Sequence, residues 1–284
     1  MKLRLICLVL GLLSAQRAQA QQSFNTTPTL NDAIPFQLES GFLILVEGRI
    51  GPLARLRFIL DTGATDTWID RKIVQKLSLP RHRAQIFNFN HHVKVERTSL
   101  PELQLGPLLV RNSCVIVGEL KQFSEFAAAV DGIVGMDLLS TTQSLRIDYS
   151  RRLVTLKTAS GREIVSHHSM NALTVQLPVQ GQPMRLIIDT GVQGLLLYKD
   201  RLHKHLPELK LTDWATGVQG RLWGESAMLS GIRLGGNEVQ ASVFLIPGEP
   251  DSIPADIDGY VGTSALKAKI VELDFATNRL RSWQ

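Results

Sequence analysis

The sequence predicts a mainly β fold made of two homologous closed-β lobes with a cleft between them. Short runs of Val, Ile, Leu and Phe are separated by Gly, Pro and Asn turns, a pattern typical of strands. An apolar run leads into Asp-Thr-Gly twice, over residues 58–63 and 186–191. The chain has 284 residues, of which 44% are hydrophobic and 20% charged, so it is long enough for two lobes with buried cores.

The motifs around the two Asp-Thr-Gly sequences recur in the same order. Asp61 of the first motif corresponds to Asp189 of the second, and "DGIVGMDLL" from Asp131 is matched by "DGYVGTSAL" from Asp258. The interval between the two members of each pair is the same to within a single position. Matched landmarks at nearly one spacing indicate an internal repeat. We therefore predict a duplicated architecture in which each half supplies one Asp-Thr-Gly turn.

The boundaries of the two lobes follow from this repeat. Residues 21–160 are predicted to form the N-terminal lobe with the first Asp-Thr-Gly, and residues 161–284 the C-terminal lobe with the second. Each lobe has one helix candidate directly after its motif, over residues 71–77 and 199–206.

Residues 1–20 have the features of a secretory signal peptide. Lys2 and Arg4 precede an apolar core over residues 5–13, and the small-x-small sequence "AQA" ends at Ala20. We expect cleavage after Ala20 and a secreted or periplasmic protein; an uncleaved anchor is the alternative. The apolar core is shorter than the ~20 residues that cross a bilayer. No other segment reaches that length, so no membrane span is expected after cleavage.

Composition excludes several kinds of partner. Removing the leader takes away three basic residues and lowers the formal charge from +5 to +2, which gives no reason to expect nucleic acid. It also leaves Cys114 as the only cysteine, so no intrachain disulfide is expected, and its apolar neighbours predict a buried thiol. The histidine pairs at 91–92 and 167–168 lack the spacing and further ligands of a metal site. We expect no metal and no cofactor.

Each Asp-Thr-Gly sequence delivers a carboxylate at the end of a strand that should be buried. The glycines, Gly63 and Gly191, permit a tight turn whose backbone N–H groups can point at the carboxylate. The threonines, Thr62 and Thr190, supply hydroxyls that can form hydrogen bonds inward.

Two such turns placed face to face would bring Asp61 and Asp189 together at the interface of the lobes. Two adjacent carboxylates cannot both ionise easily, so they share a proton. The charged carboxylate can then take a proton from a water that attacks a carbonyl, while the protonated one donates to the carbonyl oxygen. A pair that must keep one proton is expected to work best in acid.

These motifs resemble those of the aspartic proteases, the pepsin and retropepsin group. The resemblance rests on "DTGAT", "DTGVQ", "DGIVGMDLL" and "DGYVGTSAL", and it covers nearly all of the chain after the leader. The sequence is most like a bacterial retropepsin-like aspartyl protease with two fused Asp-Thr-Gly lobes. The resemblance implies pepsin/retropepsin-like lobes with a catalytic cleft between them. It also implies a monomer with a pseudo-twofold axis, acting as an aspartic endopeptidase on polypeptide substrates.

The resemblance assigns roles to residues of both turns. Asp61 and Asp189 would be the catalytic dyad. Thr62 and Thr190 would cross-link the turns, and Gly63 and Gly191 would support the carboxylate oxygens. The chain departs from the family at Val192, where Ser or Ala is usual, and this puts the tuning of the second carboxylate in question.

Members of this family cover the substrate with a hairpin flap. By position, the flap candidates are residues 87–96 and 216–225, and the substrate-binding candidates within them are Phe89, Asn90, Gly217 and Trp223. The alternative to an enzyme is a catalytically silent peptide-binding protein of the same fold.

Overall fold

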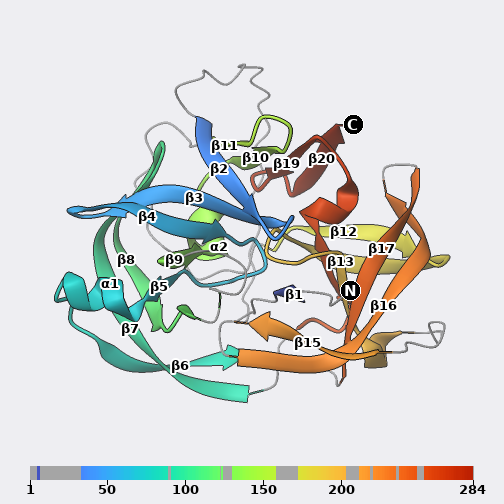
Figure 1. Cartoon of the computed structure of the whole chain (residues 1–284), viewed down its shortest axis with the longest axis horizontal. Helices are drawn as coiled ribbons and strands as arrows, with labels where there is room; N and C mark the ends of the chain where they lie inside the picture. The colour runs from blue at the N-terminus through green and yellow to red at the C-terminus, as the bar shows by residue number, and fades with distance from the viewer. Residues whose placement is uncertain are drawn as a thin grey trace.

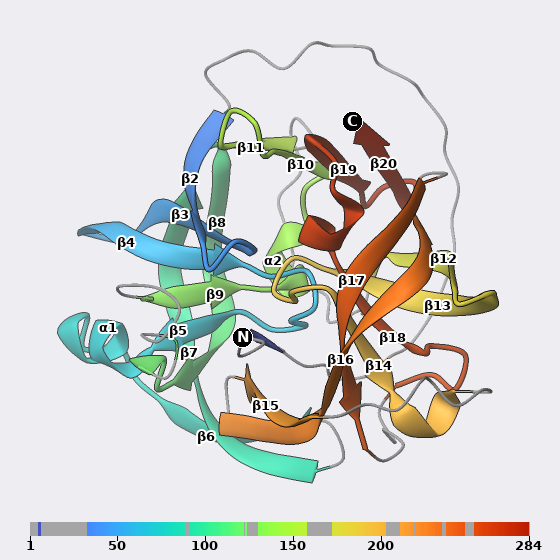
Figure 2. The same ribbon diagram turned by 45° about the vertical axis from the view of Figure 1, so that its right-hand side comes forward.

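The computed structural model describes residues 5–6, 33–88, 91–121, 123, 130–157, 172–202, 211–217, 220–234, 237–247 and 253–283. The protein is mainly β, as the sequence predicts, and the strands among these residues form two sheets. In Figure 1 strands β3 to β9 of the first half lie on the left, and β12 to β17 of the second half lie on the right. The turned view in Figure 2 keeps this arrangement, with β10, β11, β19 and β20 together near the top.

The first half of the chain begins with β2 and ends with β11. Its elements are β2 (Ala33–Glu39), β3 (Leu43–Ile50), β4 (Leu53–Leu60), β5 (Trp68–Asp70), α1 (Arg71–Lys76), β6 (His82–Asn88), β7 (His91–Leu105), β8 (Leu108–Gly118), β9 (Gly132–Val134), α2 (Met136–Leu139), β10 (Ser144–Asp148) and β11 (Leu153–Lys157).

The second half follows the same order without a counterpart of β2 among the described residues. Its elements are β12 (Thr174–Val179), β13 (Gln182–Asp189), β14 (Leu195–Tyr198), the 3-10 turn η3 (Lys199–Arg201), β15 (Leu211–Gly217), β16 (Gly220–Leu234), β17 (Asn237–Ile246), β18 (Gly259–Gly262), the 3-10 turn η4 (Thr263–Leu266), β19 (Ile270–Asp274) and β20 (Arg279–Trp283). A short strand within the expected leader, β1 (Leu5–Ile6), runs parallel to β15.

The two halves use the same pairing pattern. In the first half β4 runs parallel to β9, and β5 runs parallel to β8 and antiparallel to β9. In the second half β13 runs parallel to β18, and β14 runs parallel to β17 and antiparallel to β18. In each half the "GIVG" or "GYVG" segment therefore lies beside the strand that leads into Asp-Thr-Gly. This repeated pairing brings both turns to equivalent places.

Aspartates before these segments make the same contacts in both halves. The carboxylate of Asp131 accepts the N–H of Arg57 (2.9 Å), and that of Asp258 accepts the N–H of Arg185 (2.7 Å). The strand residues between these contacts and the turns are apolar and fully buried, because their alternate side chains pack into hydrophobic clusters on the two faces of the sheet. The catalytic-turn candidates therefore stand on rigid, buried strands.

The halves are joined through the pair β10 and β19, which lie antiparallel and extend the larger sheet to β20. The Tyr149 hydroxyl after β10 lies 2.7 Å from Oγ1 of Thr263 in η4, which adds a side-chain bond to the backbone ladder. No helix of the described residues is long and apolar enough to cross a membrane. The Cys114 thiol is only half-buried, because its strand turns it toward Arg97, and not fully buried as the sequence predicts.

The helix predicted over residues 71–77 is present as α1, and Asp70 is its N-cap. The Asp70 carboxylate accepts the N–H of Lys72 (2.9 Å) and, with its other oxygen, the buried N–H of Leu120 (3.0 Å). The candidate over residues 199–206 is helical only at η3, since Leu202 is extended, and its remainder lies outside the described residues.

We predict that Asp70→Ala lowers the free energy of unfolding by about 2 kcal/mol. Losing an N-cap costs about 0.5–2 kcal/mol, and leaving the Leu120 N–H buried without a partner adds to this cost. Urea unfolding measures the change. Asp70→Asn keeps one acceptor oxygen and should recover part of the loss. Equal losses for the two variants would contradict this assignment.

Candidate active site

The two Asp-Thr-Gly turns are bound to each other by a symmetric set of hydrogen bonds. The Thr62 hydroxyl donates to Ile188 O (2.8 Å), and the Thr190 hydroxyl donates to Leu60 O (2.7 Å). The Thr62 N–H donates to Oγ1 of Thr190 (3.0 Å), and the Thr190 N–H donates to Oγ1 of Thr62 (3.1 Å). Each threonine hydroxyl is both donor and acceptor. The four bonds therefore hold one turn in a fixed position against the other.

Both aspartates of these turns are fully buried, each with one carboxylate oxygen held by its own turn. Oδ1 of Asp61 accepts the N–H groups of Gly63 (2.8 Å) and Ala64 (3.0 Å). Oδ1 of Asp189 accepts the N–H of Gly191 (2.6 Å). This is the support that the sequence predicts for the two glycines, supplied by backbone N–H groups.

The second oxygen of each carboxylate lies against the opposite turn. A Cβ atom added to Gly63 would lie 2.0 Å from Oδ2 of Asp189, and one added to Gly191 would lie 2.4 Å from Oδ2 of Asp61. Only glycine allows this close approach. Neither Oδ2 atom has a hydrogen-bond partner among the described residues. Two buried charges in this arrangement are unfavourable, and one proton held between the carboxyl groups relieves both.

Burial sets the protonation of this pair. It raises the pKa of Asp61 from an ordinary value of 3.8 to about 6, while the Asp189 carboxyl and the N–H groups of the turn oppose the rise. Burial also raises the pKa of Asp189 well above its ordinary value, and the negative charge of Asp61 raises it further. Because Oδ1 of Asp61 accepts two N–H bonds and Oδ1 of Asp189 accepts one in the described structure, Asp61 is the better place for the charge.

Around the first turn, Asp137 of α2 is a further acid, partly buried, to which the sequence alone assigns no role. Its carboxylate accepts the N–H (3.0 Å) and the hydroxyl (2.7 Å) of Thr67, and Thr67 Oγ1 in turn accepts the N–H of Gly135 (3.1 Å). Burial raises the pKa of Asp137 to about 6. These bonds tie the segment behind the turn to the turn itself. The sequence signal that could have pointed to Asp137 is the presence of a charged residue within the apolar run "IVGMDLL".

The turn is also tied to the hairpin of β6 and β7. Arg97 of β7 forms an ion pair with Asp66 (2.7 Å), and both side chains are mostly buried. In the second half, the position that corresponds to Asp66 in the repeat is occupied by Gly194, so this contact has no counterpart there. Val192, the bulky residue after the second Asp-Thr-Gly, is fully buried, so its side chain packs inside the protein.

The described parts of the flap candidates fall on two long hairpins. Residues 87–88 and 91–96 belong to β6 and β7, and residues 216–217 and 220–225 to β15 and β16. Phe89 and Asn90 lie outside the described residues. Gly217 ends β15 opposite Gly220, and Trp223 stands 60% exposed on β16. No cluster of three or more His, Cys, Asp or Glu that could hold a metal occurs in the part of the chain that the structure describes.

Paired Asp-Thr-Gly turns that present two carboxyls are the arrangement expected from the resemblance to the aspartic proteases. Residues 46–141 match the family described as "gag-polyprotein putative aspartyl protease". This segment includes Asp61, and the match agrees with the resemblance to aspartic proteases that the sequence motifs show.

The chain is also similar to a protein of known structure. A crystal structure of a retropepsin-like aspartic protease from Rickettsia conorii matches at 20% sequence identity, with a TM-score of 0.33; the match covers 44% of this chain and 87% of that one. No curated protein matches the chain.

Proposed function

We propose that the protein is an aspartic endopeptidase that hydrolyses peptide bonds with a water activated between Asp61 and Asp189. The observation that carries this proposal is the pair of fully buried carboxyls whose Oδ2 atoms are directed between two cross-bonded turns. A buried, coupled pair of acids with displaced pKa values is typical of a catalytic site. The family match supplies the polypeptide as substrate class.

The carboxyls would act as base and acid in turn. Asp61, whose turn stabilises its charge, takes a proton from water as the water oxygen attacks the peptide carbonyl carbon. Asp189 donates its proton to the carbonyl oxygen. When the intermediate collapses, Asp61 gives its proton to the leaving amine, the C–N bond breaks, and Asp189 recovers a proton from a hydroxyl. Proton transfers of this kind contribute about 10²- to 10⁴-fold each.

The proposal extends to the whole chain. Residues 21–160 and 161–284 would be two homologous lobes, and a single chain would supply both aspartates, so the enzyme would act as a monomer with a pseudo-twofold axis. The matching strand pairings of the two halves support this division. The leader motif ending at Ala20 supports a secreted or periplasmic location.

The second candidate is a protein that binds peptide without cleaving it. The fully buried dyad favours the enzyme, because a carboxyl pair kept away from water costs stability and serves binding poorly. Incubating the protein with casein, with and without a statine-type inhibitor, separates the two. Cleavage abolished by the inhibitor supports the protease. Peptide bound but intact at every pH supports the binding protein.

We predict that the rate of casein cleavage rises with pH through a midpoint of about 6. Below this pH Asp61 is protonated and cannot accept the proton of water. Above it Asp61 is charged, and because this negative charge raises the pKa of Asp189, Asp189 keeps its proton. The pH range of activity therefore lies closer to neutral than the acidic range expected from a proton-sharing pair alone. Initial rates between pH 3 and pH 9 test this. A maximum below pH 5 would contradict it.

A further inference from the structure

Each half of the protein carries an ion pair at the root of its long hairpin. In the first half Arg71, the first residue of α1, is paired with Glu96 of β7. In the second half Lys199, the first residue of η3, is paired with Glu225 of β16, with Nζ and Oε1 2.6 Å apart. We call these two ion pairs the hairpin clasps.

The register of the strands shows that the clasps occupy equivalent places. Arg71 and Lys199 follow directly after β5 and β14, and their separation along the chain equals that of the two catalytic aspartates. Glu96 lies opposite Val117 on β8, and Glu225 lies opposite Leu245 on β17.

Val117 and Leu245 correspond in turn, because Ile69 pairs with the first and Leu197 with the second. The separation of the two glutamates along the chain exceeds that of the two cations by a single position. The two halves therefore form the same ion pair despite this difference of one position, with Arg as the cation in the first half and Lys in the second.

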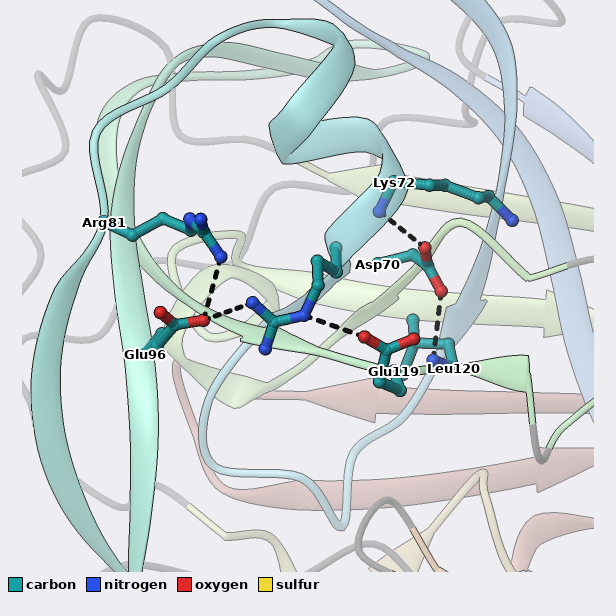
Figure 3. A network of polar contacts seen from close by, with 7 residues as sticks. Asp70, Lys72, Arg81, Glu96, Glu119 and Leu120 are labelled. Atoms are coloured by element: carbon teal, nitrogen blue, oxygen red, sulfur yellow. Dashed lines mark hydrogen bonds and ion pairs between the residues drawn. The ribbon is translucent and has the colours of Figure 1, made fainter.

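The first clasp is part of a wider polar network (Figure 3). Arg71 Nε is also 2.8 Å from Oε1 of Glu119, and Arg81 is 3.1 Å from Oε2 of Glu96. The hydrogen bond and the positive charge of Arg71 lower the pKa of Glu96, which favours the charged form of this carboxylate. The next residue, Arg97, pairs with Asp66 beyond the first Asp-Thr-Gly. At this root β7 is thus tied both to α1 and to the catalytic turn.

Each hairpin extends well beyond the ion pair at its root. Beyond Glu96, strand β6 is the edge of its sheet and pairs only with β7 among the described strands. Beyond Glu225, the hairpin of β15 and β16 carries the exposed Trp223. A small change of angle at the root therefore moves the far end of the described strands by a larger distance.

We propose that the two hairpin clasps are positioning devices that fix the angle of each hairpin at its root, and so set the affinity for peptide; for substrate affinity this rests on the proposed protease function. Exposed ion pairs add little to global stability, but a bias between two hairpin positions needs only about 0.2–1 kcal/mol, which corresponds to about a 1.4- to 5-fold change in population. Glu96 and Glu225 act through the hairpins and do not touch the reacting atoms.

The test compares Glu96→Gln and Glu225→Gln with the wild type by hydrogen exchange of the two hairpins and by peptide-cleavage kinetics. Each variant should speed exchange of its own hairpin by about two- to fivefold and raise KM by a similar factor, with kcat within about twofold. The charge-swapped double variant Lys199→Glu, Glu225→Lys should restore both readouts. It should not do so if Lys199 and Glu225 merely fill space.

A matched control is Arg281→Gln on β20, which removes an ion pair with Glu272 on β19, away from both hairpins. Its side chain is 43% exposed, close to the 47% of Lys199. It should change neither readout. Unchanged exchange in both glutamine variants, or a swap that restores nothing, would overturn the proposal. If the wild type cleaves no peptide, the proposed function fails, while the exchange measurement still decides whether the clasps hold the hairpins.

Discussion

Replacing Asp61 or Asp189 with Asn is expected to lower kcat for peptide cleavage by about a thousandfold or more. Asn has nearly the same volume and keeps an acceptor for the N–H of Gly63 or Gly191, so the turn can persist. It can neither accept the proton of water nor donate an acidic proton. Since the mechanism uses the two carboxyls in different roles, either single change removes one role entirely, and the double variant should be hardly worse than the singles.

Stability provides the control for this experiment. A group whose folded-state pKa is raised by burial stabilises the fold when protonated, and that contribution is lost as pH rises through the folded value. For Asp61 the rise from 3.8 to about 6 corresponds to about 3 kcal/mol, lost between about pH 4 and pH 6. Asp61→Asn should therefore unfold at higher urea concentration than the wild type at pH 8. An inactive variant that is also less stable at pH 8 would indicate a damaged fold and not a lost catalytic group.

The dyad could be predicted from the sequence because its signal is local and repeated. Each aspartate follows a buried strand and precedes a glycine, and the pattern occurs twice at a constant spacing. The mainly β fold followed from short apolar runs and turns in the same way. The order of strands in the two sheets and the bridging pair of β10 and β19 depend on long-range contacts, for which the sequence carries no such local mark.

The contacts that support the dyad could not be predicted for a physical reason. Asp137 meets Thr67 across 70 residues, and the two are brought together by the pairing of β5, which follows Thr67, with β9, which precedes Asp137. A search for repeats at one fixed spacing does not find the hairpin clasps, because the two glutamates are one position further apart along the chain than the two cations. Phe89 and Asn90 were proposed from position alone, and their roles remain predictions.

Replacing Gly63 with Ala is expected to lower kcat by about a hundredfold. The added Cβ would lie 2.0 Å from Oδ2 and 2.3 Å from Cγ of Asp189, far inside contact distance, so the two turns must move apart. A misplacement of about 1 Å in a catalytic geometry costs about a hundredfold in rate. Gly191→Ala meets Asp61 at 2.4 Å in the same way and should have a similar, slightly smaller effect. Kinetics at the pH of maximal activity measure both.

The matched control is Gly181→Ala in the turn between β12 and β13. Gly181 has φ of +79°, but a Cβ there would meet nothing within 4 Å. This variant should lose about 1 kcal/mol of stability through backbone strain and keep its kcat. Crowding in the core costs about 1–3 kcal/mol, so Gly63→Ala loses stability as well as rate. If Gly63→Ala retained the wild-type kcat, the carboxyl of Asp189 could not be held against the opposite turn during catalysis. The proton shared between the two aspartates would then need another geometry.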